Sequence, residues 1–138
     1  METLEKNKSK VLLQQSIEDL HREEVEWISE IEFWDLELNF FQKLLNKSSI
    51  LSSDNYDEKI QEALEGKLIQ FKKESVDTLL NEIYDQQEYF GHLLENKTGY
   101  SEISYREQHH LQFMHMNYLR KKFNAFKKEL FAFSESFM

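Results

Sequence analysis

Apolar residues recur along the first third of the chain in alternating steps of four and three residues. The repeat runs from Leu13 to Leu45, over more than four heptads, and its one polar position is Glu24. Such spacing is typical of the a/d seam of a helix that packs in coiled-coil fashion. It predicts a helix over residues 3–46 with this seam: Leu13, Ile17, Leu20, Glu24, Trp27, Ile31, Trp34, Leu38, Phe41 and Leu45.

Two later segments also have helical periodicity. The segment 56–96 is less regular, because its apolar phase slips near Ser75 as in a heptad stutter. Its predicted seam is Ile60, Leu64, Leu68, Phe71, Val76, Leu80, Ile83, Gln87, Phe90 and Leu94. The segment 102–136 keeps the repeat without a miss, through Tyr105, His109, Gln112, Met116, Leu119, Phe123, Phe126, Leu130, Phe133 and Phe137.

Short polar segments separate the three predicted helices. Residues 48–55 are rich in side chains that compete for backbone hydrogen bonds, and Asp54 or Asn55 is the expected cap of the second helix. In the second connection, Gly99 is the expected left-handed residue after the helix end. Connections this short make neighbouring helices antiparallel. We therefore predict an all-α fold, an elongated antiparallel three-helix bundle (up-down-up) with coiled-coil-like heptad packing, as one domain over residues 1–138.

Composition agrees with long helices. The chain has no proline and only three glycines, which argues against a turn-rich β fold. It has no cysteine, so disulfides, thiolate metal sites and a cysteine nucleophile are excluded. The first ten residues are polar, and no apolar run approaches the roughly 18 residues of a membrane span. We expect a cytoplasmic protein with no membrane association.

The two ends of the bundle are expected to differ. When the three helices are folded back on one another, one end gathers an aromatic core: Trp27, Ile31, Trp34, Leu38, Phe41, Leu64, Phe71, Phe123, Phe126, Leu130 and Phe133. At the other end the seam is polar, with Glu24, Gln87, His109 and Gln112 in core positions. Such residues either fix register and partner choice or form the first shell of a ligand or ion site.

The first helix has a second apolar stripe, formed by Phe33, Leu36, Phe40 and Leu44. On a helical wheel this stripe is centred about 130° from the main seam. Together the two stripes cover more than half of the helix, which leaves apolar surface over in a three-helix bundle. Two explanations stay open: a homodimer or protein-partner interface, or simple coverage by the third helix.

The spacing Glu-x-x-His occurs twice, at Glu18–His21 and at Glu107–His110. Ferritin-like and hemerythrin-like bundles use residues three apart on a helix to share a metal ion. With 20 glutamates in 138 residues, two such pairs are close to chance. The heptad frame also turns both pairs outward, and the spacing of Ser104 and Glu107 fits a capping box. If a metal binds, the inward Glu24 and His109 are the better ligands.

Charge suggests one further alternative. The chain has a net charge of -9, whereas its last segment contains a basic run, Arg120, Lys121, Lys122, Lys127 and Lys128. This run either binds nucleic acid or pairs internally with acidic helices, and the acidic whole favours internal pairing. No phosphate loop, nucleophile elbow or catalytic triad is evident. We expect a non-enzymatic bundle that binds another protein or itself and needs no cofactor; the alternative is a carboxylate/histidine metal protein.

Overall fold

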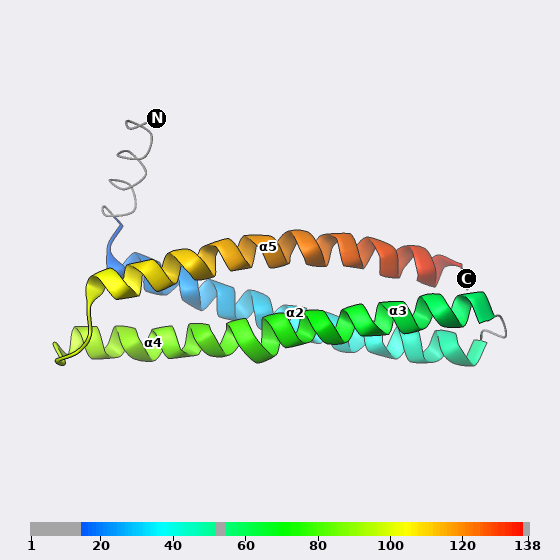
Figure 1. The fold of residues 1–138 in the computed structure, drawn as a ribbon, viewed down its shortest axis with the longest axis horizontal. Coiled ribbons are helices and arrows are strands. Elements are labelled where there is room, and N and C mark those ends of the chain that lie inside the picture. Colours follow the sequence, from blue (N-terminus) through cyan, green and yellow to red (C-terminus); the bar gives the residue numbers. More distant parts are fainter. Residues whose placement is uncertain (1–14, 52–54, 137–138) are drawn as a thin grey trace, which may run out of the picture.

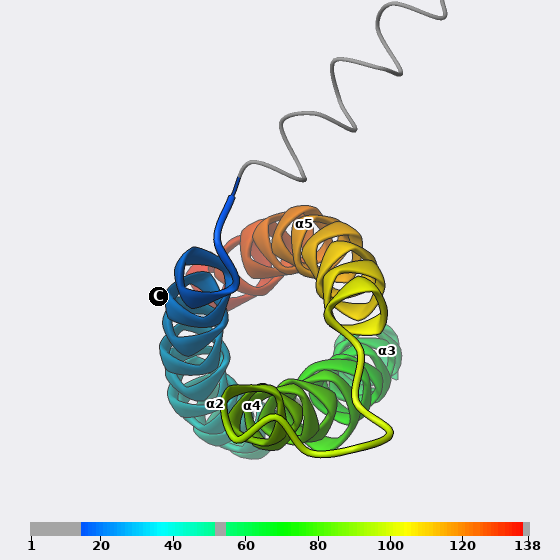
Figure 2. The ribbon, with the colours of Figure 1, turned by 90° about the vertical axis from the view of Figure 1, so that its left-hand side faces the viewer.

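The computed structural model describes residues 15–51 and 55–136 and confirms an all-α bundle. Three long helical rods pack together: α2 (Ile17–Leu51), then α3 (Asn55–Lys72) continued by η1 (Lys73–Leu79) and α4 (Leu80–Leu94), and finally α5 (Glu102–Glu135). The middle rod runs opposite to α2 and α5 (Figure 1). Seen end-on, the rods wind about a common long axis, so that α3 and α4 occupy different positions around it (Figure 2).

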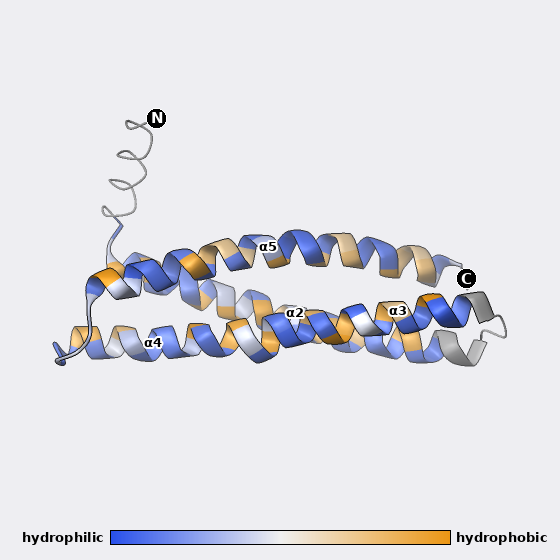
Figure 3. Cartoon of the chain, viewed as in Figure 1, coloured by the Kyte–Doolittle hydropathy of each residue, from blue (hydrophilic) through white to orange (hydrophobic). Residues whose placement is uncertain are grey.

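The rods bury one side each because apolar residues follow the heptad seams. Apolar and polar segments alternate along every rod (Figure 3). All eleven residues of the predicted aromatic end are buried, and three rings meet at its centre. Phe71 and Phe123 stack with centroids 4.5 Å apart, and Trp34 lies 5.6 Å from Phe71 and 5.8 Å from Phe123. Burial of such side chains contributes roughly 1.5–3 kcal/mol each.

The phase slip predicted near Ser75 lies inside a π-helical segment, η1. Here the backbone N–H of Leu80 bonds to the Ser75 carbonyl, five residues back. The hydroxyl of Ser75 donates to the Phe71 carbonyl and that of Thr78 to the Lys73 carbonyl, both at 2.8 Å. A π turn holds one residue more than an α turn. The segment therefore absorbs an extra residue in the heptad repeat without ending the rod.

The side chains of the middle rod that face the core differ in part from those predicted. The predicted seam residues Ile60, Val76, Leu80 and Gln87 are only partly buried. Their places are taken by neighbours, so that the observed buried set is Gln61, Leu64, Leu68, Phe71, Ser75, Leu79, Ile83, Gln86 and Phe90. From Phe71 to Ile83 the steps are four, four and four residues, as the π turn requires. The predicted position of Leu94 is exposed.

The rod ends also differ from the sequence expectation. The first helix was expected to end at residue 46, but α2 continues to Leu51, and α3 begins at Asn55. No glycine or proline interrupts this stretch, and each added helical residue gains a backbone hydrogen bond that outweighs the modest penalty of serine. The expected helix start at residue 3 and the cap Asp54 lie outside the described residues.

The left-handed residue that ends α4 is Asn96, with φ of 54°. The N–H of Asn96 bonds to the Leu93 carbonyl and that of Lys97 to the His92 carbonyl, the paired bonds of a Schellman motif. Gly99, the predicted terminator, has φ of 92° but lies further along the loop. At the start of α5 the cap is Ser101, whose side chain accepts from the Ser104 N–H. The predicted capping box at Ser104 does not form because the helix begins earlier.

Candidate functional site

The polar end of the bundle contains a buried carboxylate, Glu24, on α2. Its side chain has no exposed surface. One carboxylate oxygen, Oε1, accepts a 2.8 Å hydrogen bond from the Tyr105 hydroxyl, and Oε2 lies 2.6 Å from His109 Nδ1. Both partners are seam residues of α5. The inward positions predicted for Glu24 and His109 thus bring the two side chains into direct contact.

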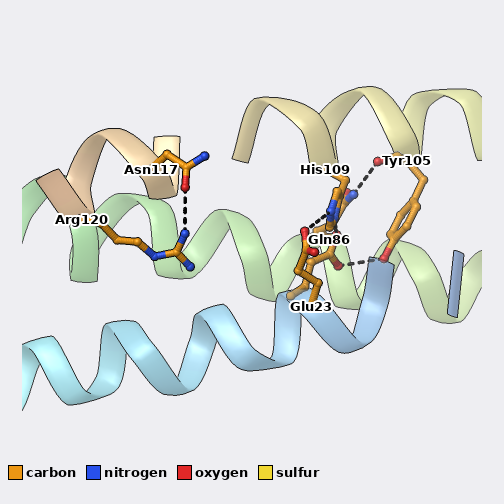
Figure 4. Close-up of polar contacts among 7 residues, drawn as sticks. Glu23, Gln86, Tyr105, His109, Asn117 and Arg120 are labelled. Atoms are coloured by element: carbon orange, nitrogen blue, oxygen red, sulfur yellow. Dashed lines mark hydrogen bonds and ion pairs between the residues drawn. The ribbon is translucent and has the colours of Figure 1, made fainter. Parts of the chain in front are cut away.

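His109 lies between two carboxylates. Its second ring nitrogen, Nε2, is 2.9 Å from Glu23 Oε1 on the rim of α2, and Figure 4 shows the ring directed from α5 towards α2. Each ring nitrogen of His109 thus lies within hydrogen-bonding distance of one carboxylate oxygen. The Trp27 ring stacks on the imidazole at 4.7 Å. The ring is therefore held on two edges and one face.

Tyr105 connects this pair to the middle rod. Burial raises the pKa of its phenol well above the ordinary value, and the charge and hydrogen bond of Glu24 raise it further. The phenol therefore stays protonated and donates to Glu24. The Tyr105 backbone carbonyl accepts a 2.7 Å bond from Gln86 Nε2 on α4. These contacts join all three rods at one level.

The predicted polar seam needs one correction. Gln86 is buried, whereas Gln87 is only partly buried, because the three-residue step falls between Ile83 and Gln86 and the four-residue step between Gln86 and Phe90. Gln112 is buried as predicted, and its Nε2 donates to the Glu82 carbonyl at 3.2 Å. Glu23 was not predicted from the sequence, because it lies beside the seam rather than in it. Its position next to Glu24, on the flank that faces α5, could have indicated its contact with His109.

Chemically, this cluster is an ion-pair network that joins the rods. Its donors and acceptors are matched only when α2, α4 and α5 are aligned as observed. A buried polar network of this kind disfavours other alignments, in which a charge would be left without a partner. The cluster therefore fixes register beside Trp27, at the limit of the aromatic core.

The metal-ligand motifs do not converge. Glu18, Glu107 and His110 are exposed, and the His21 ring stacks on Phe90 at 4.2 Å. Glu24 and His109 do face each other, but each is bonded directly to the other. Over residues 15–51 and 55–136, no group of three or more histidine, aspartate or glutamate residues has an arrangement that could hold a metal ion.

The basic run of α5 is engaged with acidic residues of other rods. Arg120 donates to both carboxylate oxygens of Glu30, and this hydrogen bonding raises the pKa of its guanidinium. Figure 4 also shows Arg120 donating to Asn117 of its own helix. Lys122 pairs with Glu74 at 3.1 Å and Lys127 with Glu37 at 3.2 Å. Lys121 and Lys128 are exposed. Three of the five cations of the basic run thus have a carboxylate partner.

The second stripe of α2 lies mainly on the surface. Its exposed fractions are 60% for Phe33, 66% for Leu36 and 56% for Phe40. The third helix of the bundle, α5, does not cover these three residues. Coverage by the third helix, one of the two explanations of the stripe, is therefore wrong for them. Leu44 differs, since it is partly buried and packs against the core. We call Phe33, Leu36 and Phe40 the outer α2 row.

Aromatic contacts extend this surface towards α5. The buried ring of Phe41 makes edge contacts with Phe40 at 5.7 Å and with Phe131 of α5 at 5.4 Å. Phe131 is itself 52% exposed. Phe40 and Phe131 therefore contact the same buried ring from two different helices.

A second exposed row, on α5, was missed in the sequence. Leu111, Met114 and Tyr118 have the same spacing as the outer α2 row and are half exposed or more. The spacing of three and four residues was the available signal, but the stronger seam of α5 masked it.

In comparisons with known proteins, no protein-family model, no curated protein and no solved structure matches this chain. Within the described part of the chain, no helix has the length and apolar character needed to cross a membrane.

Proposed function

We propose that this chain is a non-enzymatic helical bundle that acts by binding a protein through the outer α2 row. The observation that carries the proposal is the exposure of Phe33, Leu36 and Phe40, three large apolar side chains in one line. Contiguous apolar surface of this kind marks interaction sites more often than isolated apolar residues do. A bound partner would bury these three side chains, which the bundle itself leaves exposed to water.

The scaffold suits this role. The row lies on a 35-residue helix, so its side chains have a set spacing before any partner arrives. Salt bridges hold α2 to its neighbours on both flanks, through Glu30 and Glu37 to α5 and through Asp35 to Lys72. A rigid surface loses little conformational entropy on binding, which favours affinity.

The test compares Phe40→Glu with Tyr118→Glu. Both positions are aromatic and 56% exposed, but they lie on different helices. The full chain and each variant are measured for self-association by sedimentation velocity, and as bait for protein partners identified by mass spectrometry. We expect Phe40→Glu to abolish the association and Tyr118→Glu to preserve it. Equal behaviour of wild type and Phe40→Glu in both measurements would reject the proposal.

A second candidate is a carboxylate/histidine metal protein. Glu23, Glu24 and His109 supply oxygen and nitrogen donors of the kinds that metals accept, but their observed arrangement does not form a metal site. To bind an ion, Glu24 and His109 would have to exchange their mutual bond for bonds to the metal. Elemental analysis of untagged protein decides this: about one equivalent of Zn, Fe or Mn that disappears in Glu24→Gln would support it, and metal-free protein would reject it.

A further inference from the structure

The outer α2 row belongs to a longer pattern that includes charges. Glu26, Phe33, Phe40 and Lys47 follow one another at intervals of seven residues, and all four are exposed. Ser29, Leu36 and Lys43 lie between them on the same side and are also exposed. Together these seven positions form a second heptad seam on the outside of α2. It is acidic at one end, apolar in the middle and basic at the other end.

Helix geometry places this seam along one face. Seven residues turn an α-helix by about 700°, only 20° short of two full turns, so the four heptad positions fall nearly in line. The distance from Glu26 to Lys47 along the helix axis is roughly 32 Å at 1.5 Å per residue. Glu26 and Lys47 lie equally far from the centre of the seam, between Leu36 and Glu37, and so do Phe33 and Phe40.

We infer that the partner of the outer α2 row is a second copy of this chain, packed antiparallel along α2 about a two-fold axis near Leu36. This inference rests on the proposed function and names its partner. In the antiparallel arrangement, Phe33 of each copy meets Phe40 of the other, and Glu26 of each copy meets Lys47 of the other. A parallel arrangement would set Glu26 against Glu26 and Lys47 against Lys47, where like charges repel.

The acidic character of α2 does not oppose this pairing at close range. The carboxylates that border the seam on the α5 side, Glu30 and Glu37, are paired with Arg120 and Lys127. On the opposite side, Glu32 accepts a 2.9 Å bond from the Tyr84 hydroxyl. Because these groups are engaged within each copy, the charges left for recognition in the seam are Glu26 at one end and Lys43 and Lys47 at the other.

The apolar area also favours a self-complementary pairing. Each copy contributes Phe33, Leu36 and Phe40, and Phe131 extends the surface beside Phe40 through their shared contact with Phe41. The two-fold axis uses the same patch twice, so the assembly closes at two copies. A surface that carries both charge signs in mirror order about an apolar centre is complementary to itself only in the antiparallel direction.

Charge exchange on the full chain tests both the partner and its direction. We expect wild type to sediment at about twice the 16.8 kDa chain mass. Glu26→Lys and Lys47→Glu should each weaken the dimer about tenfold, because two symmetric exposed contacts change from attraction to repulsion. The double variant Glu26→Lys/Lys47→Glu should recover wild-type dissociation to within about threefold, and an equimolar mixture of the single variants should form a heterodimer. The controls Glu62→Lys and Lys128→Glu, at exposed positions off the seam, should leave association unchanged.

The outcomes separate this inference from the proposed function. A monomeric wild type would overturn self-pairing, while a Phe40-dependent complex with a different protein would leave the proposed function standing. A dimer that Phe40→Glu dissociates but that the double charge exchange fails to restore would overturn the antiparallel direction. A dimer that Tyr118→Glu dissociates and Phe40→Glu does not would place the contact on α5 and overturn both proposals.

Discussion

His109 Nδ1 on α5 and Glu24 Oε2 on α2 are 2.6 Å apart in the buried seam, 85 residues apart in the sequence. This contact is the shortest link of a network that also includes Glu23 and Tyr105. It lies at the limit of the aromatic core, where Trp27 stacks on His109. The behaviour of this network under mutation is therefore the most direct measure of how the polar end is held together.

The first prediction concerns the coupling of Glu24 and His109. Glu24→Leu and His109→Leu should each lower the free energy of unfolding by about 1–3 kcal/mol, because each deprives the other buried group of one hydrogen-bond partner, while Tyr105 still donates to Glu24 and Glu23 still lies beside His109. The double variant should lose less than the sum, with a coupling energy of about 1–3 kcal/mol. Urea denaturation followed by circular dichroism gives all three values. Additive losses would mean that the two side chains do not interact.

The second prediction concerns Tyr105 at alkaline pH. Burial and Glu24 raise the pKa of this phenol in the folded chain, whereas in the unfolded chain it ionises near its ordinary value of about 10. A raised folded pKa contributes stability that is complete below pH ~10 and is lost as the pH rises above it. Wild type should therefore lose stability above pH ~10 more steeply than Tyr105→Phe.

The same variant has an expected effect at neutral pH. Removing the hydroxyl deprives buried Glu24 of a donor, so Tyr105→Phe should be about 1–3 kcal/mol less stable there. Tyr118→Phe, at an exposed position, serves as the control and should follow the wild-type curve. If the stability of wild type and of Tyr105→Phe fell equally steeply at alkaline pH, Tyr105 would not be the cause of the alkaline loss.

The third prediction concerns the π-helical segment. Deleting the exposed Asp77 shortens the spacing from Ser75 to Leu79 to three residues and makes the buried steps regular: four, three, four, three and four from Phe71 to Phe90. The variant should fold with the same core residues and with stability equal to wild type within about 1 kcal/mol. The Leu80 N–H should lose its hydrogen bond to the Ser75 carbonyl, and hydrogen exchange at Leu80 measures this loss.

A matched deletion on α5 should behave differently. Deleting the exposed Lys121 places three-residue steps in succession between Met116 and Phe126, which rotates half of the seam away from the core. We expect loss of cooperative unfolding in this variant. If both deletions were equally damaging, the extra residue would not be what η1 accommodates.

The fourth prediction concerns the aromatic end. Phe123 is buried, stacks on Phe71 and meets the edge of Trp34, so Phe123→Ala should cost about 3–5 kcal/mol of stability. Phe131→Ala removes the same side chain from a half-exposed position and should cost less than about half as much. Thermal or urea unfolding of the pair measures the difference. Similar losses would show that the core does not concentrate at Phe123.

The sequence predicted the buried residues best where the heptad repeat is regular. On α2 and α5 the described seam residues from Leu20 onward and from Tyr105 to Phe133 are buried as predicted. In the middle rod, the choice between Ser75 and Val76, and between Leu79 and Leu80, depended on how the chain absorbs one extra residue. Local patterns do not decide between a stutter and a π turn, because both restore the apolar phase.

Helix ends were similarly ambiguous. Asn96 and Gly99 both favour a left-handed conformation, and the apolar pattern does not say which residue follows the last turn. Ser48 and Ser49 resemble the start of a connection, yet α2 continues through them to Leu51. A favourable cap residue stabilises a helix end by at most about 1–2 kcal/mol, so packing of the adjoining helix can move the end to another residue.

The amino-acid sequence by itself determined the all-α class, the three rods, the position of the aromatic core and the inward direction of Glu24, His109 and Gln112. These features depend on the period of apolar residues, which is a local property of the chain. Only the tertiary structure decided that Glu24 meets both Tyr105 and His109, that Glu23 closes the network, and that Phe33, Leu36 and Phe40 stay uncovered. Those relationships depend on the relative height and rotation of separate helices, which the packing of all three sets together.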